Sequence, residues 1–163
     1  MMNIQASKRL NKGATLVEFT IVSTFFFILI FSIIEFGRLL FTWHVLNETT
    51  RRTARLATVC QITSYEQQQT ITSAIINGVP LPNFTSTNIR LHYLDNLGNI
   101  ITGDLTDTTL SSQIKYVQAS INSYQIALII PLATFDITFT APEFKTILPR
   151  ESLGVTRTGF TDC

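Results

Sequence analysis

An almost unbroken apolar run near the amino terminus places the strongest limit on what this 163-residue chain can fold into. Between Ala14 and Ile34, Glu18 is the only charged residue. The 21 residues of this run would form roughly 31 Å of α-helix, which matches a hydrocarbon core of about 30 Å. The sequence therefore predicts one transmembrane helix, and it contains no second run of this kind.

Basic residues precede the apolar run, and the first 17 residues contain no acidic one. This asymmetry predicts a cytoplasmic amino terminus, with everything after Leu40 on the outer side of the membrane. The basic residues beyond the run weigh against this orientation, but Glu35 and Glu48 lie among them. The basic residues on the two sides are Lys8, Arg9 and Lys12 before the run, and Arg38, Arg51, Arg52 and Arg55 after it.

Glu18 is a candidate functional residue because a carboxylate at the centre of a bilayer costs on the order of 2.5 to 3.5 kcal/mol. Its setting resembles the class III, or prepilin-type, signal of type IV pilins and pseudopilins. In that signal a dedicated peptidase cuts after glycine and leaves glutamate as the fifth mature residue. The resemblance implies a cut between Gly13 and Ala14, which would leave the apolar helix in the mature chain. An ordinary secretory signal is instead cut after its apolar region. The alternative for Glu18 is a side chain that extends to the lipid headgroups.

The predicted organisation is a leader over 1–13, a transmembrane helix over 14–40 and an extracytoplasmic α+β domain over 41–163. The outer domain is large enough for one modest core. The net charge of +1 gives no support for a nucleic-acid partner. Cys60 and Cys163 both fall on the outer side, where an oxidising compartment favours a disulfide between them. The alternative is two unrelated thiols.

The apolar periodicity continues past the span, which predicts that the long helix extends as an amphipathic helix. A capping-box pattern that starts at Ser64 predicts a second helix over about 65–77. We expect a mainly antiparallel sheet to pack on the upper half of the long helix, where Ala54 and Ala57 permit close approach. The period changes to two after Pro82, and it predicts strands at 89–93, 100–101, 117–121 and 124–130, a loop over 102–112, and a last strand that includes Phe135, Ile137 and Phe139.

Charged residues on the long helix have two interpretations. Arg51, Arg52 and Arg55 either form a solvated helix face or contact neighbouring subunits. Glu48 stands four residues before Arg52, a spacing that adds a small stabilising contribution. Glu35 and Arg38, three residues apart at the outer end of the span, are predicted to form an ion pair, and a subunit contact is the alternative.

Four segments together resemble the TadE-like minor pilins, or pseudopilins, of the bacterial tight-adherence (Flp/Tad) pilus system. Major pilins of that system are short and usually have tyrosine after the glutamate, so Phe19 and a sizeable outer domain fit a minor subunit better. The segments are Glu18-Phe19 after Gly13, Ile34 to Arg38 at the exit from the span, Asn47 to Ala57 ahead of Cys60, and Leu148 to Gly154.

This resemblance implies an inner-membrane protein that is processed by a prepilin peptidase and takes part in pilus assembly or initiation. The implied partners are other major and minor pilins, the inner-membrane assembly platform and the lipid bilayer. The sequence leaves open whether the chain sits at the pilus tip, along the shaft or only at the platform. Cleavage would free an α-amino group at Ala14, one helical turn from Glu18. In pilin-like assemblies such a carboxylate can neutralise the amine of a neighbouring subunit.

We expect no catalytic activity, cofactor or metal. His44 and His92 lack the Glu-x-x-His or paired-cysteine spacing of a metal site, and the chain has no Gly-x-Ser-x-Gly motif or phosphate-binding glycine loop. The alternative function is a single-pass envelope protein with a ligand-binding or sensory outer domain, in which the Gly13 and Glu18 match is accidental. Peptidase cleavage after Gly13 distinguishes the two functions.

Overall fold

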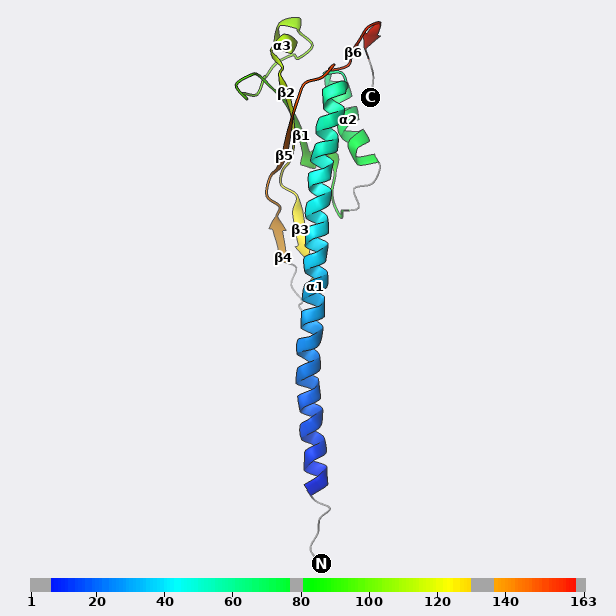
Figure 1. Ribbon diagram of the computed structural model, residues 1–163, viewed down its shortest axis with the longest axis vertical. Coiled ribbons are helices and arrows are strands. Elements are labelled where there is room, and N and C mark those ends of the chain that lie inside the picture. Colours follow the sequence, from blue (N-terminus) through cyan, green and yellow to red (C-terminus); the bar gives the residue numbers. More distant parts are fainter. Residues whose placement is uncertain (1–6, 77–80, 130–136, 161–163) are drawn as a thin grey trace, which may run out of the picture. The chain divides into compact units, whose positions relative to one another are not determined.

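The computed structural model describes residues 7–76, 81–129 and 137–160 (Figure 1). It contains a long amino-terminal helix, a short second helix and antiparallel sheets. The predicted α+β class is therefore confirmed. The chain divides into two compact units, one of Met1–Leu40 with Ala127–Ile137 and the other of Phe41–Ile126 with Thr138–Cys163.

Helix α1, Ser7–Val59, joins the predicted span and its amphipathic continuation in one element. No side chain between residues 13 and 41 is buried, whereas buried positions recur at helical spacing from Thr42 onward. Among them are Leu46, Ala54 and Ala57, each at most 1% exposed. The outer part of α1 is thus the core helix of the second unit.

The main sheet has the order β1-β2-β5, and both of its strand pairs are antiparallel. Its register pairs Ile89 with Ile121, and Ile121 with Phe144. Five consecutive residues of β2 are buried, which is the burial expected of a central strand. The strands are β1 Ile89–Leu94, β2 Tyr116–Ile121 and β5 Phe144–Pro149.

Strand β5 was not predicted, because the last strand that the alternation indicates is the one that includes Phe139. Phe144 is buried and Thr146 is half-buried, whereas the large apolar Ile147 is 46% exposed. Thr146 is a polar residue on the inner face and Ile147 is an apolar residue on the outer face. The sequence of β5 therefore lacks the apolar-polar alternation that predicts a strand.

The sheet packs on the outer part of α1, as predicted. Trp43 meets Phe144 edge to face with ring centroids 5.0 Å apart, and the hydroxyls of Thr50 and Thr146 lie 3.1 Å apart. Ala57 belongs to a buried cluster with Val117 from β2. A second cluster joins α1, α2 and all three strands of the sheet through Leu46, Ile71, Ile89, Ile121 and Phe144.

The second helix, α2 (Ser64–Ile76), begins at Ser64, one residue earlier than predicted. The backbone N–H of Glu66 donates to the Thr63 hydroxyl at 3.2 Å, so Thr63 and not Ser64 caps the helix. The predicted stop signals at 77–80 lie outside the described residues.

Two predictions in the sheet region were wrong in part. Residues 100–101 form a single bridge between Ile100 and Leu94 in place of a strand, because β1 pairs with β2. The predicted loop over 102–112 overlaps helix α3, Thr108–Gln113. The first turn of α3 is capped by the Asp107 carboxylate, which lies 2.8 Å from the Thr109 nitrogen.

The remaining elements are short. A 3-10 turn, η1, covers Ser86–Asn88 and precedes β1. Strands β3 (Gln125–Leu128) and β4 (Ile137–Thr140) form a two-stranded sheet, which confirms strands in both places, and predicted strand residue Phe135 lies outside the described residues. Strands β6 (Val155–Thr156) and β7 (Gly159–Phe160) form a second, antiparallel pair.

Candidate functional site: the exposed part of helix α1

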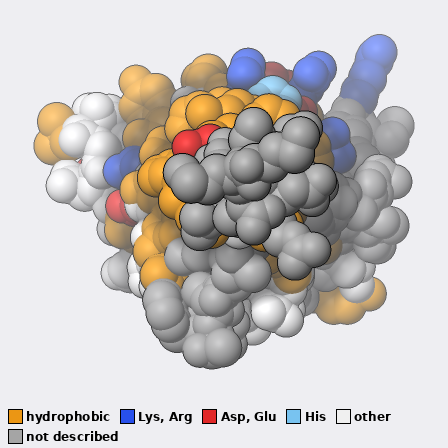
Figure 2. Space-filling view, turned by 90° about the horizontal axis from the view of Figure 1, so that it is seen from below, with side chains coloured by type: hydrophobic (Ala, Val, Ile, Leu, Met, Phe, Trp, Pro, Cys, Tyr) orange, Lys and Arg blue, Asp and Glu red, His pale blue; other side chains and the backbone are white. Residues whose placement is uncertain are grey.

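The amino-terminal part of α1 presents a large apolar surface. Phe19 and Phe25 are 72% and 71% exposed, and most of the large apolar residues up to Phe41 are also exposed. Figure 2, seen from the amino-terminal end, shows hydrophobic side chains in orange beside the residues drawn in grey. Within the described residues, α1 is the one helix long and apolar enough to cross a membrane. It is compatible with single-pass anchoring.

Three hydroxyl groups within the apolar surface donate to backbone carbonyls of the helix itself. Thr20 donates to the Leu16 carbonyl at 2.8 Å, and Thr24 donates to the Thr20 carbonyl at 2.8 Å. Ser32 donates to the carbonyl of Ile28 at 2.7 Å. These bonds remove the cost of bringing hydroxyl donors into hydrocarbon. Glu18 is exposed and remains the one charged side chain between residues 13 and 34.

The predicted cleavage site lies inside α1. Gly13 and Ala14 are both exposed. Apart from its chain neighbours and the adjacent helix backbone, no atom of the described residues lies within 4 Å of the position that a Cβ on Gly13 would occupy. Glycine in a helix interior costs about 1 kcal/mol relative to alanine, so the helix is locally weakened at this point. Residues four apart share a helix face, so an amine created at Ala14 would lie on the same face as Glu18.

Glu35 and Arg38 form the ion pair that their spacing predicts. The guanidinium engages both carboxylate oxygens, with Arg38 Nη2 at 2.5 Å from Glu35 Oε1 and Nε at 2.9 Å from Oε2. The two side chains are 18% and 30% exposed, respectively. Two parallel bonds of this kind fix the geometry more strongly than a single contact.

The same pair binds the end of β3 and the residue that follows it, within the first unit. The backbone N–H of Ile129 donates to Glu35 Oε1 at 3.1 Å, and Arg38 donates to the carbonyl of Ala127. Sequence reasoning missed this contact, because the partners lie 94 and 89 positions apart and interact through backbone atoms that carry no residue signature. The interaction observed for this pair is thus within its own chain.

We expect Glu35→Gln to loosen the segment after β3. A hydrogen bond to a charged group contributes about 1.5 to 3 kcal/mol, so the Ile129 amide should exchange its hydrogen roughly tenfold faster or more. Hydrogen exchange read by NMR or mass spectrometry on the full chain measures this rate. Glu48→Gln is the matched control, since it removes an exposed carboxylate from the same helix. An unchanged Ile129 exchange rate would show that the pair does not hold this segment.

The three arginines of the predicted contact surface are all exposed on α1. Arg52 and Glu48 form the expected pair at 3.8 Å, and both side chains are about half exposed. Such a pair contributes little to stability because water screens it. Subunit contact through Arg51, Arg52 and Arg55 remains a prediction.

Cys60 follows the end of α1 and is 1% exposed. Its predicted partner, Cys163, lies outside the described residues, so the disulfide remains a prediction. We expect the denatured, unreduced chain to take up no thiol-alkylating reagent and the reduced chain to take up two equivalents. Intact mass measures the uptake, and two alkylated cysteines without reductant would contradict the disulfide.

Comparison with protein families gives a match over the amino-terminal segment. Residues 13–55 match the family described as TadE-like protein. The amino-terminal segment of this chain is TadE-like. The suspected resemblance is thereby confirmed, and it indicates association with the Tad pilus. No curated protein and no solved structure matches the chain.

The TadE-like segment covers the candidate site and leaves out most of the outer fold. It starts at Gly13, contains Glu18, the Glu35 and Arg38 pair and the three arginines, and ends at Arg55 before Cys60. The helices α2 and α3 and all of the strands lie beyond it. The match therefore concerns the membrane-length helix and its continuation.

Proposed function

We propose that this chain is a minor pilin or pseudopilin that a prepilin peptidase cleaves between Gly13 and Ala14, and that it acts in the assembly or initiation of a Tad pilus. The observation that carries the proposal is the TadE-like match over a helix whose apolar surface is unburied and bears a single carboxylate, Glu18. The role is structural, without catalysis.

Charge pairing gives Glu18 a specific role in assembly. Cleavage converts the Ala14 nitrogen into a positively charged amine, and the carboxylate of one subunit neutralises the amine of its neighbour. Attraction between two such charges at 4 Å is about 1 kcal/mol in water and about 4 kcal/mol at an effective dielectric constant of 20. Once paired, the charges oppose movement of the helix from lipid into an apolar filament core less than an unpaired amine would.

The exposed apolar residues serve two environments in this account. Before assembly they lie in the inner membrane, with the leader in the cytoplasm and the outer domain on the opposite side. During assembly they pack against the helices of neighbouring pilins at the assembly platform. Both environments are apolar, so the transfer needs no change in the side chains that α1 presents.

A deletion strain tests this function. Removal of the chain should abolish or sharply reduce surface pili, and re-expression should restore them, as seen by electron microscopy and by immunoblotting of sheared surface fractions for the major pilin. A deletion strain that remains fully piliated would contradict the proposal and favour a single-pass envelope protein with another task.

A further inference from the structure

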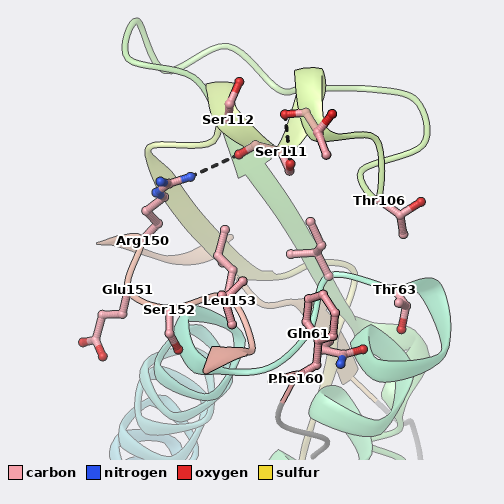
Figure 3. A pocket seen from close by; sticks show the side chains of 13 residues that line it. Gln61, Thr63, Thr106, Ser111, Ser112, Arg150, Glu151, Ser152, Leu153 and Phe160 are labelled. Atoms are coloured by element: carbon pink, nitrogen blue, oxygen red, sulfur yellow. Dashed lines mark hydrogen bonds between the residues drawn. The ribbon is translucent and has the colours of Figure 1, made fainter. Parts of the chain in front are cut away.

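A pocket of about 590 Å³ lies at the carboxyl end of α1, entirely within the second unit. Its walls come from the loop after α1, from α3 and the turn before it, from the segment after β5, and from the β6-β7 hairpin (Figure 3). The proposed role in pilus assembly does not use this pocket. Its volume falls in the range of about 300 to 1,000 Å³ typical of small-molecule sites.

Backbone bonds fix the wall that follows β5. The Leu153 N–H donates to the Thr58 carbonyl at 3.0 Å, so this segment satisfies one of the last carbonyls of α1. The Arg150 N–H donates to the Lys115 carbonyl at 2.9 Å. Gly154 has a φ of +79°, and a Cβ there would lie 2.7 Å from backbone atoms of Gln61. The wall after β5 is therefore held in place by backbone hydrogen bonds and by close backbone packing.

Several hydroxyl groups of the pocket already donate their protons within the protein. The hydroxyl of Ser111 donates to the carbonyl of Thr108 at 3.2 Å, and that of Ser112 donates to the carbonyl of Thr109 at 2.8 Å. The Thr106 hydroxyl donates to the Asp104 carboxylate at 2.6 Å, a bond that lowers the pKa of Asp104. The oxygens of these three hydroxyls remain acceptors for a ligand.

Other pocket residues supply donors. The Arg150 guanidinium donates one N–H to the Ser111 carbonyl at 3.1 Å, which orients it beside the serines in Figure 3, and a guanidinium has five N–H groups in all. Gln61 adds an amide, and the Thr63 hydroxyl accepts from the Glu66 N–H, which leaves its own proton to donate. The pocket thus offers donors and acceptors together.

The pocket also has an aromatic wall. Phe160 from β7 lines it and is 70% exposed, an unusual exposure for a phenylalanine outside the membrane span. Leu153 lies in the same lining and is buried. An apolar ring beside hydrogen-bonding groups suits a ligand with one apolar face and a polar rim.

We propose that this pocket binds a neutral saccharide of one or two sugar units. Each sugar hydroxyl both donates and accepts, which matches the mixed lining, and the C–H face of the ring covers Phe160. An inorganic anion fits less well, because it mainly accepts hydrogen bonds, several hydroxyl protons here are already used, and the Glu151 carboxylate in the lining repels it.

The test uses the full chain in phosphatidylcholine nanodiscs, because glycoside detergents would themselves occupy a sugar site. Lactose, cellobiose and N,N′-diacetylchitobiose are titrated by saturation-transfer difference NMR, with empty nanodiscs as the blank and inorganic phosphate as the competitor. We expect at least one disaccharide to bind and phosphate not to displace it. Phe160→Ala should weaken binding about tenfold, since it removes apolar contact area.

Two further variants test whether the sugar binds in this pocket. Tyr65→Ala removes another exposed aromatic ring, outside the pocket lining, and should leave binding unchanged. Ser112→Ala removes one acceptor and should weaken binding about threefold. Unchanged fluorescence of Trp43, the single tryptophan, verifies that each variant is folded. Absence of binding by all three sugars, displacement by phosphate, or full affinity in Phe160→Ala would each overturn the proposal.

Discussion

Cells in which Glu18→Gln replaces the natural chain are expected to lose surface pili while still cleaving the chain after Gly13. Glutamine keeps the size and shape of the side chain but cannot neutralise the amine of a neighbouring subunit. An unpaired amine then opposes entry into an apolar filament core. The lost attraction of about 1 to 4 kcal/mol corresponds to roughly a fivefold to thousandfold weaker addition of each subunit.

Two measurements separate this effect from a processing defect. Intact mass of the membrane fraction reports cleavage, and electron microscopy with immunoblotting of sheared fractions reports assembly. Glu48→Gln removes an exposed carboxylate outside the apolar segment of the same helix and should leave both unchanged. Normal piliation in the Glu18→Gln strain would count directly against charge pairing and favour a carboxylate that only reaches the headgroups.

Gly154→Ala is expected to give the largest loss of stability in the outer fold, about 2 to 4 kcal/mol. Gly154 has a positive φ, which costs an L-residue about 1 kcal/mol or more. In addition, the new Cβ would lie 2.7 Å from backbone atoms of Gln61, so the backbone itself would have to move. The wall over the end of α1 would shift as a result.

Gly98→Ala is the matched control for the cost of the positive φ alone, without a close contact. Its φ of +85° is close to that of Gly154, but nothing lies within 4 Å of its Cβ position, so we expect a loss of about 1 kcal/mol. Chemical denaturation of the full chain, followed by Trp43 fluorescence, measures both variants. Equal losses would show that the contact between Gly154 and Gln61 contributes nothing to stability.

Sequence reasoning was strongest for features that repeat along one element. The apolar run and the small residues Ala54 and Ala57 predicted where α1 is exposed and where it is buried, because helical periodicity records burial directly. The spacing of Glu35 and Arg38 likewise predicted their ion pair. These are local rules that a single segment obeys by itself.

The long-range failures involve partners that are distant in sequence or hidden by a broken pattern. The bonds from Glu35 to Ile129 and from Thr58 to Leu153 use backbone atoms, which any residue supplies. Strand β5 was missed because Ile147 faces outward. The pocket joins four separate segments, and none of them carries a recognisable ligand motif alone.

The most direct measurement is the intact mass and amino-terminal sequence of the membrane-extracted chain, made with and without the prepilin peptidase of its own system. The account predicts a mature chain that begins at Ala14 only when the peptidase is present. A chain that keeps its Met1 or Met2 terminus in both strains would contradict it, because Glu18 would then have no processed amine to neutralise.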